Sequence, residues 1–245
     1  MNNPKFLFEP GNILTIEKFA PIMSGYPYEY CHYNNLSMLP PETYKLNYIP
    51  VGSVQYIKEY CKIMNLELPN SISYYGLERF LKRDIREGNL EDASDDEFVK
   101  PKNVKQFTGD IKKNLRPLSP KTKVWISPAV PFESEFRFYI HDFVNGPKIF
   151  GWSRYDDLNV ENPNPDLYYI RPIMESLHKQ NGPISYSIDI GWRTDIQEYD
   201  VVELNDAWAL GYYKNNDKQS NPPSEDDYVQ MLISRWNQIL FCNIV

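Results

Sequence analysis

One acidic side chain in the last third of the chain stands out from its surroundings because it interrupts an alternating apolar pattern. Apolar residues fall at every second position across 184–191, and this period predicts a β-strand. Successive side chains of a strand point to opposite faces, so Asp189 points away from the face that carries Ile188 and Ile190. The sequence therefore predicts a carboxylate on the polar face of a strand whose other face is buried.

A second strand, predicted around residues 199–205, brings two more oxygen-bearing side chains close to Asp189. Residues 193–195 supply a polar turn between the two strands. Alternation places Glu203 and Asn205 on one side, together with Tyr199 and Val201. Two carboxylates and an amide oxygen suit Mg²⁺, which keeps some waters and takes its remaining ligands from phosphates. Ordinary surface acids at a solvated sheet edge would give the same pattern, and this alternative stays open.

Five ordered segments extend this signal upstream and downstream. The segment 203–212 resembles the closing segment of ATP-grasp enzymes, in which an E-x-N strand end holds magnesium and a loop of small residues follows. Four earlier segments match the same family in order: 98–101, 105–109, 134–137 and 153–155. The set most resembles the phage and bacterial ATP-grasp clade named for two arginines and a lysine. The resemblance covers roughly residues 50–213.

The resemblance implies a fold, a domain organisation and a metal site. The expected fold class is α+β, an ATP-grasp fold in which two α+β subdomains grip ATP, with a reduced N-terminal domain. The expected division is a reduced N-terminal region over residues 1–75 and an ATP-grasp domain over residues 76–245. Asp189, Glu203 and Asn205 take the positions of the family's metal ligands, and the implied cofactors are ATP and Mg²⁺.

A hairpin in the middle of the chain predicts a pair of arginines. Asn145-Gly146 is a strong signal for a two-residue turn. If Val144 pairs with Pro147, Arg137 lies directly opposite Arg154. Two guanidinium groups side by side favour an anion between them, and their planar forks match phosphate or carboxylate oxygens. The resemblance also places both arginines in the active cleft, as catalytic residues.

The alternative for this hairpin is a salt bridge. Glu135 lies on the same face of the predicted strand as Arg137 and could neutralise one of the arginines. Within the family resemblance, Glu135 instead counts among the residues that bind the cofactor. A register slip of two residues would keep the arginines on one face and remove their direct pairing.

The resemblance assigns two lysines and a short strand to the nucleotide. Lys100 ends a predicted strand before a proline, and Lys105 precedes a loop with a glycine at 109 that could fold over a triphosphate. Residues 125–127, which are Trp125, Ile126 and Ser127, occupy the expected hinge that meets the adenine ring. Many members carry an acidic residue in this hinge. Here its place is taken by Ser127-Pro128, so the resemblance implies that backbone carbonyls recognise the adenine amino group.

Composition agrees with such an enzyme and argues against some other classes. The 245 residues are 42% hydrophobic, enough for a sizeable core in one large domain or two small ones. No stretch has the length and apolarity of a membrane span, and the first residues show no signal-peptide pattern, so we expect a cytoplasmic protein without a membrane partner. A net charge of −7 makes a nucleic-acid partner unlikely.

The resulting hypothesis is an ATP-dependent carboxylate–amine ligase that forms an amide or peptide bond through an acyl phosphate. Its substrates would be a carboxylate and an amine acceptor carried by a small molecule, a peptide or a protein terminus. A non-catalytic ATP-binding module is the first alternative, since the same residues would bind ATP. A metal-dependent nuclease is the second and fits less well, because Asn205 stands where its D-(x)n-E-x-K motif requires a lysine.

Three further segments give clear secondary-structure predictions. Apolar residues at helical spacing between Val51 and Met64 predict a helix, with Ser53 able to cap its start. A second helix is predicted over residues 77–86. A third, opened by acids at 225–227, carries one apolar stripe toward the C-terminus.

Overall fold

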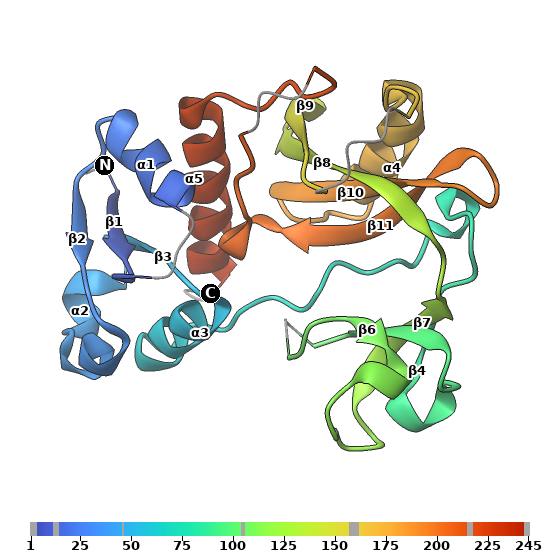
Figure 1. Cartoon of the computed structure of the whole chain (residues 1–245). Coiled ribbons are helices and arrows are strands. Elements are labelled where there is room, and N and C mark those ends of the chain that lie inside the picture. The colour runs from blue at the N-terminus through green and yellow to red at the C-terminus, as the bar shows by residue number, and fades with distance from the viewer. Residues whose placement is uncertain are drawn as a thin grey trace.

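Within the part of the chain that the structure describes, the fold consists of three sheets of three or four strands each and their flanking helices. The computed structural model describes residues 4–11, 15–45, 47–103, 106–156, 162–214 and 218–242. The strand orders of the sheets are β2-β1-β3, β4-β7-β5-β6 and β11-β10-β8-β9. Figure 1 shows the β11-β10-β8-β9 sheet above the β4-β7-β5-β6 sheet, with the N-terminal elements to one side.

The N-terminal sheet is parallel and includes β1 (Lys5–Phe8), β2 (Tyr28–Tyr30) and β3 (Tyr48–Val51). Parallel neighbours need crossover connections, and here these contain α1 (Thr15–Met23) and the short α2 (Pro41–Tyr44). Helix α3 (Val54–Ile63) follows β3, and the Ser53 hydroxyl accepts a hydrogen bond from the Tyr56 N–H at 3.2 Å. The predicted helix and its cap are confirmed.

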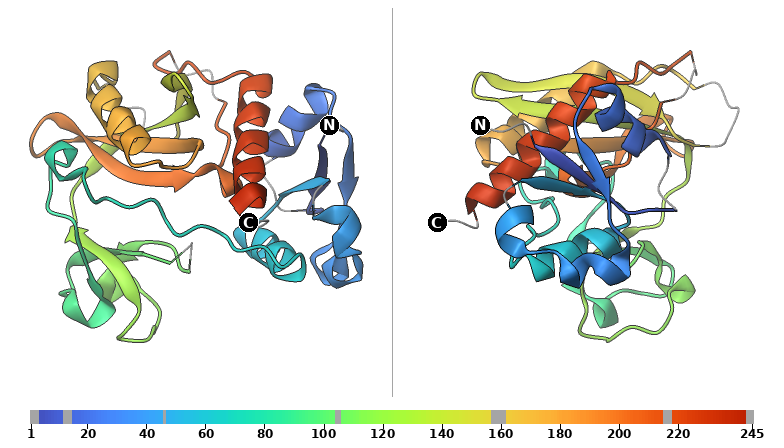
Figure 2. Two further views of the ribbon diagram at one scale, coloured as in Figure 1. Left: turned by 180° about the vertical axis from the view of Figure 1, so that it is seen from behind. Right: turned by 90° about the vertical axis from the view of Figure 1, so that its left-hand side faces the viewer.

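The C-terminal helix packs with the N-terminal elements. Helix α5 (Glu225–Cys242) runs beside α1, as the view from behind in Figure 2 also shows. The ring of Trp236 lies edge-on to Tyr60, with centroids 6.5 Å apart, in a core shared by both ends of the chain. A domain boundary between residues 75 and 76 stays a prediction, and α5 contacts the region on the far side of it.

The largest sheet is antiparallel and has one face covered by α4 (Leu167–Lys179). Its strands are β8 (Phe132–Phe143), β9 (Gly146–Arg154), β10 (Ser185–Arg193) and β11 (Glu198–Asp206). Phe138, Ile188 and Ile190 are fully buried on the face toward α4. The predicted alternation in β10 is thus confirmed, and the opposite face is left for polar groups.

The third sheet is small and antiparallel. Its strands are β4 (Arg86–Asn89), β5 (Glu97–Pro101), β6 (Asp110–Ile111) and β7 (Lys123–Pro128). Val99, Val124 and Ile126 are fully buried between this sheet and its loops. Strand β7 leads directly toward β8, so one short connection joins the two antiparallel sheets (Figure 1).

The helix predicted over residues 77–86 is wrong. The structure has one 3-10 turn, Glu78–Phe80, followed by extended chain that enters β4. The Lys82 N–H donates to Asp200 Oδ1 at 2.9 Å, and Arg83 Nη1 to Asp200 Oδ2 at 2.7 Å. These contacts to β11 hold the segment extended, and sequence periodicity cannot report them.

Within the described ranges, no helix combines the length and apolarity needed to cross a membrane.

Candidate active site

A β-bulge in β11 determines which side chains of the β10–β11 hairpin lie on each face of the sheet. Asp189 pairs with Glu203, but Ile190 pairs with Val201, so Val202 is an extra residue in β11. The bulge reverses the alternation at this point, and Val201 shares the buried core face with Leu204. The prediction that Val201 and Tyr199 lie on the same side as Glu203 is therefore wrong. The predicted shared side of Glu203 and Asn205 is correct.

The three predicted metal ligands converge on the face opposite α4. Asn205 Nδ2 lies 3.1 Å from Asp189 Oδ2 and 2.6 Å from Glu203 Oε1, and donates to both. Asp189 is fully buried. The predicted ligand set consists of two carboxylates and one amide. Among the described residues, no group of three His, Cys, Asp or Glu side chains could hold a metal ion.

Arg137 of β8 forms a two-pronged ion pair with Asp189. Its Nε and Nη2 donate to the two carboxylate oxygens at 2.9 and 2.6 Å, and the Ser187 hydroxyl donates to Asp189 at 3.1 Å. The Arg137 guanidinium lies 5.5 Å from the ring centre of Tyr155 and 5.0 Å from that of Tyr213. Burial raises the pKa of Asp189, while the charge of Arg137 acts in the opposite direction. The guanidinium is fixed in place by both the carboxylate and the rings.

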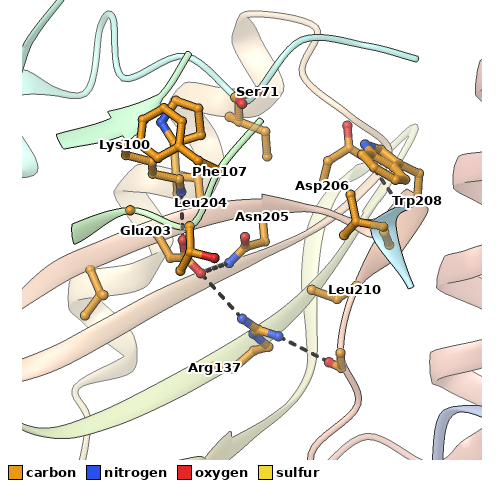
Figure 3. A pocket seen from close by; sticks show the side chains of 18 of the residues that line it. Ser71, Lys100, Phe107, Arg137, Glu203, Leu204, Asn205, Asp206, Trp208 and Leu210 are labelled. Atoms are coloured by element: carbon orange, nitrogen blue, oxygen red, sulfur yellow. Dashed lines mark hydrogen bonds and ion pairs between the residues drawn. The ribbon is translucent and has the colours of Figure 1, made fainter. Parts of the chain in front are cut away.

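Lys100 connects the small sheet to the large one. Its Nζ lies 2.8 Å from Glu203 Oε2, and Arg137 Nη2 lies 3.7 Å from Glu203 Oε1 (Figure 3). Burial alone would raise the pKa of Glu203, but the charge of Lys100 and its hydrogen bond lower it to about 2. Glu203 is therefore ionised at neutral pH and lies between two cations, one from each sheet.

The predicted direct pairing of Arg137 with Arg154 is wrong. Phe143 pairs with Gly146, so the turn residues are Val144 and Asn145, and a register shift follows between Tyr139 and Ile140.

As a result of this register, Arg137 pairs with Ser153, and Arg154 pairs with Phe136. Cross-strand partners share a face of the sheet, so Arg154 lies on the face opposite Arg137. Its Nε and Nη2 bind Asp156 at 2.8 and 2.9 Å, and its guanidinium lies 6.0 Å from the Phe136 ring. A catalytic role for Arg154 stays a prediction, but the two guanidinium groups do not lie side by side around a common anion site.

We expect Arg154→Lys to affect stability more than activity. Lysine loses the planar fork toward Asp156, which should lower the free energy of unfolding by about 1–2 kcal/mol. ATP turnover should stay within about twofold of the wild type, because the residue faces away from Arg137. Denaturant titration and ADP release measure the two effects. Arg137→Lys is the matched comparison, and a large loss of turnover in Arg154→Lys alone would contradict this assignment.

A cavity of about 570 Å³ opens between the two antiparallel sheets. Figure 3 shows its labelled side chains: Lys100 and Phe107 come from one half, and Arg137, Glu203 and Asn205 from the other. The extended segment before β4 contributes Ser71, and the segment after β11 contributes residues 208–211. Glu17 of α1 also lines the cavity. The charged groups described above thus face a space large enough for a nucleotide-sized ligand.

The three hinge residues do not line this cavity. The Trp125 ring packs edge-on against Tyr74 and Tyr75, with centroids 5.2 and 5.4 Å apart. Ile126 lies in the core of the small sheet, and Ser127 is buried in β7. Recognition of adenine by this strand stays a prediction.

The remaining predicted residues lie beside the cavity or outside the described part of the chain. Glu135 accepts a hydrogen bond from the Tyr155 hydroxyl, and burial raises the pKa of the Glu135 carboxyl group. Lys105 lies outside the described residues, and its role stays a prediction. Sequence reasoning missed Glu17, for which no motif gives a signal, and Tyr213, which directly follows the closing segment 203–212.

The fold and the cavity define an ATP-grasp protein, the class of ATP-dependent ligases in which two halves close on a nucleotide. A family model described as an ATP-grasp domain, family 3 of the clade named for two arginines and a lysine, matches residues 45–230, and the chain belongs to this family. The predicted superfamily, clade and α+β fold are confirmed. No curated protein matches the sequence.

Solved structures share the fold at low sequence identity. An ADP complex of N5-carboxyaminoimidazole ribonucleotide synthetase is similar with a TM-score of 0.54 and 10% identity, covering 96% of this chain and 77% of that one. The ATP-grasp ligase PsnB, complexed with precursor peptide PsnA2 and AMPPNP, gives 0.51 and 10%, covering 96% and 97%. The N5-carboxyaminoimidazole synthetase of Staphylococcus aureus gives 0.51 and 8%, covering 96% and 78%. These likenesses show the fold alone.

Proposed function

We propose that the protein is an ATP- and Mg²⁺-dependent carboxylate–amine ligase that works through an acyl phosphate. The observation that carries this proposal is the contact of Lys100 with Glu203 across the cavity, next to Arg137. Lys100 and Arg137 come from two separate sheets and line the same cavity. A ligand with several negative charges requires such a group of cations. Helix α1, through Glu17, and the segment after β11, through residues 208–211, also line the same cavity.

In the proposed reaction, a substrate carboxylate oxygen attacks the γ-phosphorus of ATP, and ADP leaves. The amine nitrogen then attacks the acyl carbon, and inorganic phosphate leaves as the amide forms. Lys100 and Arg137 offset the charge on the transferred phosphoryl oxygens, and the Tyr155 and Tyr213 rings hold the Arg137 fork in one orientation. No nucleophilic side chain is required.

The residues of the hairpin partly fit a magnesium ion. Glu203 and Asn205 line the cavity, whereas both Asp189 oxygens already accept hydrogen bonds from Arg137. The Asn205 amide presents its nitrogen to the carboxylates, and rotation of the amide would present the oxygen that a hard cation requires. We therefore propose Glu203 and Asn205 as the accessible ligands, with Asp189 as the buried third member. When bound, Mg²⁺ would neutralise phosphate charge.

The substrate classes remain those expected from the sequence. Among the proteins that share the fold, PsnB is complexed with a precursor peptide, and another is an N5-carboxyaminoimidazole ribonucleotide synthetase. We propose a carboxylate and an amine acceptor carried by a small molecule, a peptide or a protein terminus. We also propose a cytoplasmic location.

Positional isotope exchange in ATP tests the proposal without an identified amine. With ATP labelled at the β,γ-bridging oxygen, reversible phosphoryl transfer to candidate carboxylates should scramble the label in the presence of Mg²⁺. Addition of EDTA should abolish the exchange. Hydroxylamine should trap the acyl phosphate as a hydroxamate.

The same preparations separate the alternatives. Tight ADP binding by calorimetry without exchange or hydroxamate across a broad carboxylate panel would favour a non-catalytic ATP-binding module. Magnesium-dependent cleavage of plasmid or RNA would favour a nuclease. Absence of ADP binding would contradict the proposal outright.

A further inference from the structure

A small apolar pocket of about 70 Å³ lies beside the main cavity and shares part of its wall. Both spaces are lined by Glu17, Val54 and residues 208–211. The rest of the small pocket comes from the β3–α3 junction and from α5, including Ile57 and Leu232. It is therefore a side pocket that the N-terminal and C-terminal elements build together.

Glu17 lies where the two spaces meet. Among the described residues that line the side pocket, only this side chain is charged. Its Oε1 accepts a hydrogen bond from the Tyr212 N–H at 3.3 Å. Glu17 also lies in the first turn of α1, where the helix dipole favours an ionised carboxylate. A negative charge is thus held at the mouth of an apolar pocket.

Gly211 lies next to both this carboxylate and the Arg137 guanidinium of the proposed phosphate site. A Cβ placed on Gly211 would lie 3.2 Å from Arg137 Nη1 and 3.3 Å from Glu17 Oε1. The cation and the anion therefore both lie close to the position that a side chain would occupy at residue 211. A ligand with an ammonium group at Glu17 would lie next to whatever anion Arg137 binds.

We infer that the side pocket binds the acceptor substrate, a primary amine that carries a small aliphatic group. This inference rests on the proposed ligase function. The acceptor would bind as an ammonium paired with Glu17 and lose one proton before its nitrogen attacks the acyl phosphate, and the aliphatic group would fill the apolar pocket. The pocket, at about 70 Å³, is small beside the 570 Å³ of the main cavity, and this size favours a side chain of alanine to valine size over an aromatic ring.

The inference also gives the N-terminal region a role. Glu17, Val54 and Ile57 belong to α1 and α3, which lie outside the two antiparallel sheets that hold Lys100 and Glu203. One part of the molecule would then position the nucleotide, and the other would select the amine.

Direct binding of defined amines tests the inference. The probes are L-valine and L-valinamide, with isovalerate as the analogue without the amine and L-phenylalanine as the oversized one. Binding is measured by calorimetry and saturation-transfer NMR, with and without ADP. We expect valine or valinamide to bind at least about tenfold more tightly than isovalerate and phenylalanine. Preference for valinamide would indicate a peptide N-terminus, and preference for valine a free amino acid.

Two variants address the charge and the volume separately. Glu17→Gln removes the charge, and Ile57→Phe narrows the side pocket from a position that does not line the main cavity. Each should weaken binding of the preferred amine at least about tenfold, and Ile57→Phe should leave ADP affinity within about twofold. Glu42→Gln, on the exposed surface of α2, is the matched control and should behave as the wild type. Thermal melts establish that each variant is folded.

The failures of the two proposals are distinguishable. Absence of ADP binding by the wild type would contradict the ligase proposal. The amine titrations without ADP would still measure whether the side pocket binds the amine. Equal binding of isovalerate and valinamide, absence of amine binding, or wild-type amine affinity in both folded variants would overturn the inference.

Discussion

Asp189→Asn is expected to lower the free energy of unfolding by about 3–5 kcal/mol, because the buried Arg137 guanidinium loses its two-pronged charged partner and keeps the more distant charge of Glu203, at 3.7 Å. Asp189 is fully buried, and its two oxygens accept hydrogen bonds from Arg137 at 2.9 and 2.6 Å. ATP turnover should also be lost, since the Arg137 fork is no longer held in position. Urea titration monitored by fluorescence gives the stability, and ADP release gives the activity.

Asp200→Asn is the matched control for this prediction. Asp200 is also fully buried in the same hairpin and pairs with Arg83 at 2.7 Å, but it does not line the cavity. The Asp200→Asn variant should be less stable than the wild type for the same electrostatic reason, and its folded fraction should keep the wild-type ADP affinity. Wild-type stability in Asp189→Asn would contradict the buried ion pair, and full turnover would contradict the site.

Glu203→Gln is expected to reduce ATP turnover at least about 100-fold, equivalent to about 2.7 kcal/mol of transition-state stabilisation. The change removes the carboxylate that lies 2.8 Å from Lys100 and 3.7 Å from Arg137. It also removes the accessible charged ligand proposed for Mg²⁺. Steady-state ADP release over a range of Mg²⁺ concentrations measures the loss.

A double-mutant cycle with Lys100→Met shows whether the contact across the cavity is energetically real. The two changes should be non-additive in ADP affinity, since each removes one partner of the same ion pair. Glu87→Gln with Lys102→Met is the matched control pair. Lys102 also extends from the end of β5, and its Nζ lies 2.5 Å from Glu87 Oε1, away from the cavity. Additive effects at Lys100 and Glu203 would mean that the ion pair does not contribute to nucleotide binding.

The sequence was sufficient for the features that depend on local pattern. Alternation predicted that Asp189 opposes Ile188 and Ile190, and the structure confirms it because a strand with one buried face has a fixed period. The same holds for the capped helix after Ser53. The ordered motifs predicted the family and hence the α+β fold, because each motif is a run of neighbouring residues that can be read directly from the chain.

The tertiary structure alone decided which side chains meet. The bulge at Val202 turns Val201 into the core while Glu203 stays on the polar face, and the shift beyond Tyr139 places Arg154 on the face opposite Arg137. One extra residue in a strand reverses the side of every residue beyond it, and no local pattern marks where that residue is tolerated.

The same limit applies to contacts between distant segments. Lys100 reaches Glu203, and Glu17 reaches Tyr212, across long intervals of sequence. These positions depend on how the sheets and helices pack, because packing is set by the summed burial of many side chains. The sequence therefore indicated Lys100, Arg137, Glu203 and Asn205 as groups of the site. The packing of the sheets and helices determined which of them face one another, and it added Glu17 and Tyr213.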